Sequence, residues 1–283
     1  MFFIAKTAWI SYNELGDNMN KELKCSVVMT VYNAERFLRD TIESVLRQTM
    51  KDFELIIVND CSTDSSEEIV KEYLSDERVR YFKNEKNMKV SKTRNFGVSQ
   101  AKANRVAFID SDDIWLDTKL EKQLAHMDKT GARICYSSYA FISDDGTLQN
   151  RIFDVPEKVT FKRLLKQNVI TPSASIFDKE LLVKFPFYAD AVHEDFVAFL
   201  QMLKNEKIEA FGIRDPLILY RLTAGSKSRN KLKAMKMTLK SYKEVGLGLI
   251  SQIYYLPFYI VNGLMKYRGL KNAKNEGYTR KTV

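Results

Sequence analysis

The sequence contains an acidic cluster, Asp110-Ser111-Asp112-Asp113, directly after an apolar run at residues 105–109. Three carboxylates within four residues repel one another unless a cation neutralises them. Carboxylate oxygens at the end of a strand suit Mg²⁺ or Mn²⁺, which are shared with substrate phosphates. The cluster is therefore a candidate metal site, and the alternative is a solvated acidic turn or an aspartate-rich helix start.

Three other side chains can act on a ligand. Asp60 ends an apolar run at residues 53–58, where its carboxylate can accept hydrogen bonds from a nucleobase or ribose. The same segment is also typical of a loop before a helix, with Asp64 as the N-cap, and the two interpretations are compatible. Tyr32 can stack on a base or pack as an ordinary aromatic. Arg94 can pair with phosphate or with the aspartates, or it can be an exposed helix charge.

A second acidic group, His193-Glu194-Asp195, opens a predicted helix with an apolar face. Acidic residues in a first turn are favoured by the helix dipole, so a purely structural role is the strong alternative. The functional interpretation is a general base that takes the proton of an acceptor hydroxyl.

Short apolar runs alternate with helical patterns over the first half of the chain. Residues 25–31, 53–58, 79–82 and 105–109 are predicted strands, whereas residues 37–46, 64–74 and 90–100 are predicted helices. Asp64 and Glu67 have the spacing of a capping box. Strands alternating with helices predict right-handed βαβ units and a mostly parallel sheet. Ligands in such sheets bind at the carboxyl ends of the strands, where the candidate residues lie.

The second half of the chain is more mixed. It contains predicted helices at residues 118–130 and 194–204 and predicted strands at residues 134–141, 174–177, 208–213 and 217–220. The fold class that follows is α/β, with a Rossmann-like, mostly parallel sheet flanked by helices.

The positive charge of the chain is concentrated near its end. The whole chain has a net charge of +9, whereas residues 227–283 hold thirteen Lys and Arg against two Glu, a net of +11. The first 226 residues therefore sum to −2, which argues against a nucleic-acid-binding core and for a tail that meets an anionic surface. Three scattered cysteines without a CxxC pair indicate reduced thiols in a cytosolic protein, not a disulfide frame or a zinc site.

We divide the chain into an N-terminal extension (1–23), a main α/β domain (24–226) and a basic, partly apolar helical tail (227–283). Residues 245–265 are uncharged, and their length reaches the ~20 residues that a spanning helix needs. They also contain Pro257, polar side chains and three glycines, so we expect peripheral, in-plane contact with an anionic membrane surface rather than a span. The alternative is a pair of helices packed on the domain. The expected location is cytoplasmic, at the inner face of the cell membrane.

Four ordered segments resemble one enzyme family. They are SVVMTVYN at residues 26–33, IVNDCSTD at 57–64, TRNFG at 93–97 and FIDSDDIW at 108–115. In this order they are similar to glycosyltransferase family 2, whose members have the GT-A fold. Residues 119–124, 171–175 and 220–233 further resemble bacterial members that build teichuronic acid, capsule or O-antigen.

The resemblance implies a role for each matching position. Thr30, Tyr32 and Asp60 would hold the nucleotide, with UDP expected, and Arg94 would lie by the donor. Asp110 and Asp112 would form the DxD pair, in which Asp112 touches the Mn²⁺ or Mg²⁺ that bridges the diphosphate. Asp195 would be the general base of a single inverting displacement, with Glu194 as the second choice. The partners so implied are a nucleotide-sugar donor and a glycan or polyprenyl-linked acceptor, with no nucleic acid.

The chain departs from the family pattern at two places. Many members have a glycine-rich turn at residues 87–90, where this chain has Asn-Met-Lys-Val, and many have a histidine where this chain has Thr223.

Several rival functions can be weighed on the same residues. A processive synthase would need a Gln-x-x-Arg-Trp motif after Asp195, but the only tryptophans are Trp9 and Trp115, so we expect one sugar per encounter. The segment after the first strand has no glycine, which excludes a sugar nucleotidyltransferase and a NAD enzyme. A polyprenyl-phosphate sugar synthase, whose acceptor needs no base, remains the alternative, and a non-catalytic sugar-binding or assembly module is a remote one.

Overall fold

The computed structural model describes residues 22–187, 193–222 and 231–266. Nearly all of the predicted N-terminal extension lies outside these residues, as do Thr223 and both ends of the predicted tail.

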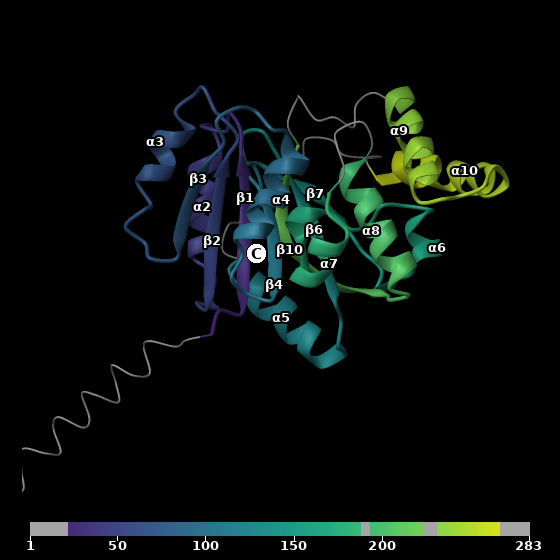
Figure 1. Ribbon diagram of the computed structural model, residues 1–283, viewed down its shortest axis with the longest axis horizontal. Coiled ribbons are helices and arrows are strands. Elements are labelled where there is room, and N and C mark those ends of the chain that lie inside the picture. The colour runs from purple at the N-terminus through teal and green to yellow at the C-terminus, as the bar shows by residue number, and fades with distance from the viewer. Residues whose placement is uncertain (1–21, 188–192, 223–230, 267–283) are drawn as a thin grey trace, which may run out of the picture.

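A single sheet runs through the described part of the chain (Figure 1). Its strands follow the order β3-β2-β1-β4-β9-β6-β10-β5, with β7 paired to β6 and β8 to β10. Strands β1 to β4 pair in parallel, β10 is parallel to β6, and β9 lies antiparallel between β4 and β6. The predicted α/β class with a mostly parallel sheet is confirmed. The strands are β1 (Cys25–Val31), β2 (Phe53–Asn59), β3 (Val79–Lys83), β4 (Arg105–Asp110), β5 (Ile114–Trp115), β6 (Ile134–Ser143), β7 (Leu148–Phe153), β8 (Lys158–Val159), β9 (Ser175–Asp178) and β10 (Ala210–Leu222).

The strand register brings the candidate residues to one edge. Thr30 of β1 lies opposite Val58 of β2 on one side and opposite Asp110 of β4 on the other. Asp60 directly follows Asn59, the last residue of β2. Because all three strands run in the same direction, their carboxyl ends form the shared edge at which open α/β sheets bind ligands.

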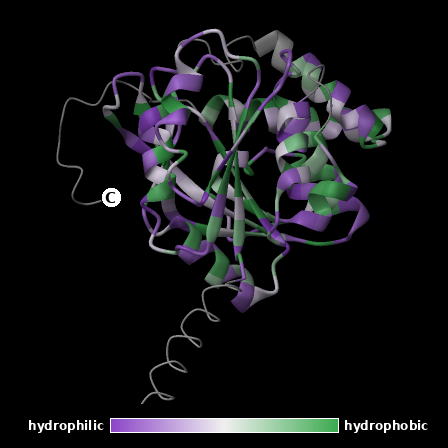
Figure 2. Ribbon diagram, turned by 60° about the vertical axis from the view of Figure 1, so that its left-hand side comes forward, coloured by the Kyte–Doolittle hydropathy of each residue, from purple (hydrophilic) through white to green (hydrophobic). Residues whose placement is uncertain are grey.

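Helices flank this sheet. α4 packs on β1 and β2, and α5 packs on β6 and β10. The helices are α2 (Leu38–Leu46), α3 (Ser66–Lys71), α4 (Val90–Gln100), α5 (Lys119–Thr130), α6 (Phe161–Leu164), α7 (Lys179–Lys184), α8 (Glu194–Asn205), α9 (Lys231–Glu244) and α10 (Leu249–Lys266), with a 3₁₀ turn at η1 (Pro172–Ala174). Hydrophobic residues gather in the central strands, and the surrounding helices show hydrophilic residues as well (Figure 2).

Close packing between α4 and β1 depends on Gly97. A Cβ atom added at this position would lie 2.3 Å from Cγ1 of Val28, far inside van der Waals contact. Val28 is fully buried in the middle of the sheet, between Ile56 and Phe108. The glycine of the TRNFG segment therefore lets α4 approach the strand that ends at Thr30.

The last strand differs from its prediction. Residues 208–213 and 217–220 were expected to form two strands, but residues 210–222 form a single strand, β10. Its pairing with β6 shifts register on both sides of Pro216. Proline lacks a backbone donor, so it interrupts the hydrogen-bond ladder without ending the strand.

The two tail helices pack on the domain. Tyr242 of α9 is fully buried, and its hydroxyl donates to the backbone oxygen of Leu165 at 2.6 Å. In α10, the ring of Tyr259 lies 5.3 Å from that of Phe196 in α8, and Asn262 donates to the backbone oxygen of Lys166. None of the helices among the described residues is both long enough and apolar enough to cross a membrane.

Candidate functional site

A cavity of about 460 Å³ opens at the carboxyl ends of β1, β2 and β4. It contains five of the predicted donor-binding side chains: Thr30, Tyr32, Asp60, Asp110 and Asp112. Its remaining lining comes from Val31, Asn33, Ala34, Phe37, Asn87, Lys89, Val90, Thr93 and Ser111. Arg94 lies behind the lining and contacts it through Asp110, whereas Asp195 is not among the lining residues.

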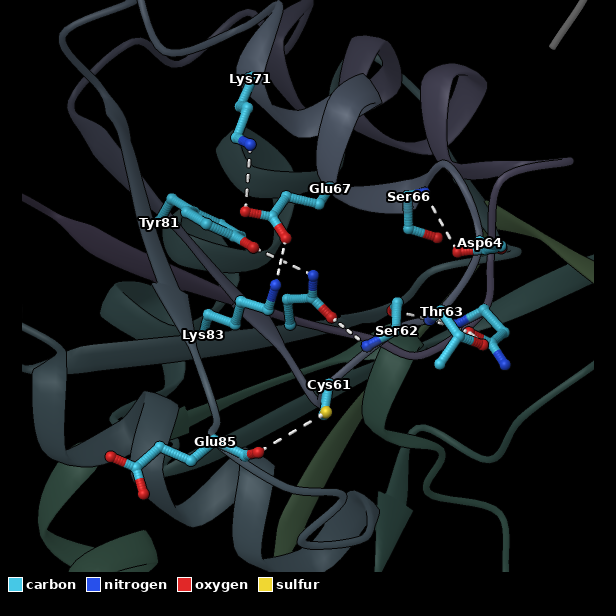
Figure 3. A network of polar contacts seen from close by, with 12 residues as sticks. Cys61, Ser62, Thr63, Asp64, Ser66, Glu67, Lys71, Tyr81, Lys83 and Glu85 are labelled. Atoms are coloured by element: carbon cyan, nitrogen blue, oxygen red, sulfur yellow. Dashed lines mark hydrogen bonds and ion pairs between the residues drawn. The ribbon is translucent and has the colours of Figure 1, made fainter.

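Hydrogen bonds connect the loops that follow β1 and β2. The amide of Asn33 donates to Oγ of Ser62 at 3.1 Å, and the amide of Thr63 donates to Oδ1 of Asn33 at 2.8 Å. Asn33 and Cys61 both have positive φ, 50° and 63°, so each loop turns sharply away from its strand. Figure 3 shows the second loop, in which Sγ of Cys61 donates to the backbone oxygen of Glu85 and the amide of Ser62 donates to Oδ1 of Asn59. Hydrogen bonds between the two loops therefore hold together the wall of the cavity beside Tyr32 and Asp60.

Asp60 is buried, and its carboxylate organises the loop before α4. Oδ1 accepts hydrogen bonds from Nδ2 of Asn84 and from the amide of Met88, both at 2.7 Å. Oδ2 accepts one from the amide of Lys89 at 2.9 Å. A carboxylate offers about four acceptor positions. The remaining position, on Oδ2, suits a single donor such as the N–H group of a base.

The acidic turn is neutralised on one side by Arg94. The guanidinium is nearly fully buried and donates to Oδ1 of Asp110 at 2.5 Å. Burial by itself lowers the pKa of Arg94, but Asp110 raises it more, so the net pKa lies above its usual value. Burial and the charge of Asp110 together raise the pKa of Asp112 to about 6. Asp112 thus faces the cavity as a carboxylate whose charge is only partly balanced.

Arg94 and Asn95 connect the acidic turn to the segment that precedes α8. Asn95 exchanges two hydrogen bonds with the backbone of Phe187, each 3.0 Å long, and the Arg94 guanidinium lies 5.6 Å from the ring of Phe187. Asp195 and Glu194 both raise the pKa of Arg94, so both acids at the start of α8 lie within electrostatic reach of it. The candidate base is therefore near the DxD pair, although it lies outside the cavity lining.

Arg221 is a site residue whose role the sequence did not reveal. Its amide donates to Oδ1 of Asp113 at 2.9 Å, and its Nε donates to the backbone oxygen of Asp112 at 2.8 Å. The guanidinium also donates to the backbone oxygen of Ser143 and lies 4.4 Å from the ring of Phe37, which lines the cavity. Arg221 thus holds the acidic turn at Asp112 and Asp113, whereas Arg94 holds it at Asp110. The signal in the sequence was its place in residues 220–233, one of the segments that resemble bacterial members of the family.

A buried lysine is linked to the acidic turn through Trp115 and Ser173. Lys119 is fully buried, and its Nζ lies 3.9 Å from the centre of the Trp115 ring. Trp115 donates through Nε1 to the backbone oxygen of Ser173, whose Oγ accepts from the amide of Asp110 at 2.8 Å. Burial lowers the pKa of Lys119 to about 7. The lysine therefore belongs to a chain of contacts that ends on the first residue of the DxD pair.

The oxygen ligands of the turn fit a divalent cation that is shared with a substrate. The described residues contain no group of three or more His, Cys, Asp or Glu side chains able to hold an ion by themselves. Mg²⁺ and related ions are commonly held by one or two carboxylates together with phosphates and water. A cation beside Asp112 would also neutralise the carboxylate repulsion that raises its pKa.

The open α/β sheet with this cavity at its carboxyl edge has the GT-A fold, as its similarity to solved structures over most of the chain shows. TarS of S. aureus, residues 1–349 in complex with UDP-GlcNAc, superposes with a TM-score of 0.65 at 21% identity and covers 87% of this chain and 76% of its own. The mannosyltransferase PcManGT from Pyrobaculum calidifontis, in complex with GDP-Man and Mn²⁺, gives a TM-score of 0.63 at 11% identity over 89% of this chain and 77% of its own.

The sequence comparisons identify the family. The model of Glycosyl transferase family 2 matches residues 26–184. The putative teichuronic acid biosynthesis glycosyltransferase TuaG of Bacillus subtilis (strain 168) is 35% identical over 78% of this chain and 87% of its own length. The Escherichia coli UDP-Glc:alpha-D-GlcNAc-diphosphoundecaprenol beta-1,3-glucosyltransferase WfgD is also 35% identical, over 88% of this chain and 97% of its own. The chain belongs to glycosyltransferase family 2, and it is a glycosyltransferase.

Proposed function

We propose that the protein transfers one sugar per encounter from a UDP-sugar to a hydroxyl group of a lipid-linked acceptor in cell-envelope polysaccharide synthesis. The observation that carries the proposal is the shared cavity, which joins Thr30 and Tyr32 to Asp60 and the acidic pair Asp110 and Asp112. Both ends of a nucleoside diphosphate have a suitable partner there: polar and aromatic groups for the nucleoside, and carboxylates for the cation that accompanies a diphosphate. The structure of TarS with UDP-GlcNAc and the full name of WfgD, which specifies UDP-Glc, support UDP as the nucleotide.

In this proposal, Asp112 and Asp110 would hold Mn²⁺ or Mg²⁺, which would supply positive charge beside the diphosphate. The Mn²⁺ in the PcManGT complex supports such an ion. Thr30 and Tyr32 orient the nucleoside, and the free acceptor position of Asp60 binds its base or ribose. Arg94 donates to Asp110 and fixes its carboxylate in place. A rigid turn matters because an oriented donor reacts faster than a mobile one.

Asp195 is the proposed general base, with Glu194 as the second choice. The acceptor oxygen attacks the anomeric carbon from the side opposite the nucleoside diphosphate, which leaves, and the configuration is inverted. Asp195 takes the hydroxyl proton as the new bond forms. The relative WfgD is named for a sugar on diphosphoundecaprenol as its acceptor, which favours a hydroxyl acceptor over the polyprenyl phosphate of the alternative synthase.

Two substitutions and one matched control test this assignment. Asp112→Asn should abolish the Mn²⁺-dependent part of UDP binding measured by calorimetry, because an amide is a poorer metal ligand. Asp195→Asn should retain UDP binding but lose transfer to a hydroxyl acceptor. Asp117→Asn changes the charge by the same amount at an exposed aspartate nearby and should match the wild type.

Each alternative function predicts a different result in these experiments. Full transfer activity in Asp195→Asn would favour a polyprenyl-phosphate acceptor, which is already ionised. UDP binding without transfer to any sugar or lipid acceptor would favour a sugar-binding module.

We further propose that the tail (227–283) docks the catalytic domain (24–226) on the inner membrane surface, through the outer side of α10. That side carries large exposed apolar residues while Tyr259 and Asn262 hold the helix to the domain. Basic side chains border it: Lys166 lies 5.0 Å from the ring of Phe258, and Arg151 donates to the backbone oxygen of Met265. An apolar helix side with a basic border suits the interface of an anionic membrane. The exposed apolar residues of α10 are Leu249, Ile250, Ile253, Tyr254, Phe258, Ile260, Val261, Leu264 and Met265.

Sedimentation with lipid vesicles tests the membrane proposal. The wild type should sediment with vesicles that contain phosphatidylglycerol and less with neutral ones, and Ile250→Asp should weaken sedimentation about tenfold because a charge replaces a side chain that is 86% exposed. Val183→Asp, at an exposed apolar position of α7, is the control. Equal sedimentation of the two variants would refute the role of α10.

A further inference from the structure

Lys89 has a backbone conformation that is almost exclusive to glycine. Its φ is 69° and its ψ is 159°, immediately before the first residue of α4. A side chain in this region clashes with its own backbone, and such residues persist only where the surrounding structure holds them. Here the amide of Lys89 donates to Oδ2 of the buried Asp60 at 2.9 Å, so the conformation is locked. Glycine would remove the strain and keep this hydrogen bond.

Lys89 also differs in charge from the other ionisable residues that line the cavity. Among the described residues that line it, three are carboxylates (Asp60, Asp110 and Asp112), and Lys89 is the one cationic side chain. The nearby Arg94 does not balance the charge of all three carboxylates, because its guanidinium is already paired with Asp110. An anionic ligand that enters the cavity without a metal ion therefore meets net negative charge, and among the described lining residues the ammonium group of Lys89 is the one protein cation that can attract it.

We propose that Lys89 binds the phosphate groups of the donor nucleotide and that the strained backbone is retained because only a residue with a side chain can supply this cation. The inference rests on the proposed nucleotide-sugar donor and adds a residue to that site. Lysine suits the contact because its ammonium group is a compact point charge on a long flexible stem. Its stem begins beside Asp60, the proposed partner of the base or ribose, and so can extend from there toward the diphosphate.

Three variants separate the charge of Lys89 from its backbone strain. Lys89→Met removes the charge and keeps a side chain in the strained conformation, Lys89→Arg keeps the charge, and Lys89→Gly removes both the charge and the strain. Lys92→Met is the matched control, since Lys92 is exposed in the first turn of α4 and does not line the cavity.

The affinity for UDP, measured by calorimetry with Mn²⁺, should fall about 5- to 30-fold in Lys89→Met and Lys89→Gly, as expected for a partly exposed charge-assisted contact. Lys89→Arg and Lys92→Met should remain within about twofold of the wild type. Binding of uridine, which lacks phosphate, should be the same in all variants. Equal UDP affinity in Lys89→Met and Lys92→Met, or a parallel loss of uridine binding, would overturn the inference.

Thermal melting gives a second, independent result. Lys89→Gly should melt roughly 2–6 °C above Lys89→Met, because glycine tolerates the backbone conformation and both variants lack the charge. A Lys89→Gly variant that melts at or below Lys89→Met would refute the claim of strain. If the wild type bound none of UDP, GDP and dTDP, the proposed nucleotide-sugar donor itself would be refuted, which is a different failure from loss of the Lys89 effect alone.

Discussion

Replacing Gly97 by alanine should destabilise the protein, although alanine favours helices. The added Cβ would lie 2.3 Å from Cγ1 of Val28, which is fully buried and pinned in register between β2 and β4. Overpacking of a rigid core costs about 1–3 kcal/mol. Alanine recovers up to about 1 kcal/mol of helix propensity. The expected net loss is about 1–2 kcal/mol, or roughly 2–8 °C in melting temperature.

Gly263→Ala is the matched control for this substitution. Gly263 also lies inside a helix, α10, but nothing lies within 4 Å of the position its Cβ would take. Alanine should therefore stabilise this site by up to about 1 kcal/mol. The free energies of unfolding of the two variants, measured in urea, should differ by roughly 1–3 kcal/mol.

A double-mutant cycle tests the stated cause. Removing both γ-methyl groups of Val28 leaves its Cβ 3.5 Å from the new atom, an ordinary contact. Val28→Ala alone should cost about 1–3 kcal/mol as a cavity. The loss of unfolding free energy in the double variant should be smaller than the sum of the two single losses by about 1–3 kcal/mol. Additivity to within about 0.5 kcal/mol would refute the clash with Val28 as the cause.

The remaining predictions concern the supports of the acidic turn. Asn95→Ala removes both hydrogen bonds to Phe187, and transfer should fall about 10- to 100-fold while UDP affinity stays within about twofold; equal losses would contradict a role on the acceptor side. Arg221→Lys should lower stability by about 2–3 kcal/mol in urea unfolding, whereas Arg214→Lys, on the surface, should have little effect. Lys119 has a folded pKa of about 7 against 10.5 for the free side chain, so at intermediate pH the unfolded chain binds a proton that the folded one lacks. Stability should therefore rise between pH 7 and about 8.5 in the wild type and not in Lys119→Met, and identical slopes would show that the lysine stays protonated in the fold.

The parallel half of the sheet was predictable because its strands are buried on both faces. β1, β2 and β4 are short apolar runs, a pattern that local sequence displays without any knowledge of neighbours. β5 was missed because it is two residues long and exists through pairing of Trp115 with Ile218, which are distant in sequence. Short elements of this kind are made by tertiary contacts and carry no periodic signal.

Candidate residues at strand ends were also predictable, because a parallel sheet brings those ends together. Thr30 and Asp110 face each other in adjacent strands, as alternation of strands and helices implied. The partners of these residues were not predictable. Glu67 was expected to complete a capping box, but it pairs with Lys71 and Lys83 instead, while Asp64 accepts from the amide of Ser66. Nothing local indicates which of several partners a flexible charged side chain takes.

The tail helices α9 and α10 pack against α8, the helix that carries the proposed base, and this packing couples the two proposals. Asp195 and Phe196 are neighbours in the first turn of α8. Phe196 is fully buried, with the rings of Tyr242 from α9 and Tyr259 from α10 at 6.3 and 5.3 Å. A membrane contact on the outer side of α10 would therefore involve a helix that packs directly against Phe196, the neighbour of Asp195. An acceptor with a lipid anchor would have its anchor at α10 and its sugar hydroxyl near Asp195, so the packing of these three helices fixes the distance between the membrane surface and the proposed site of reaction.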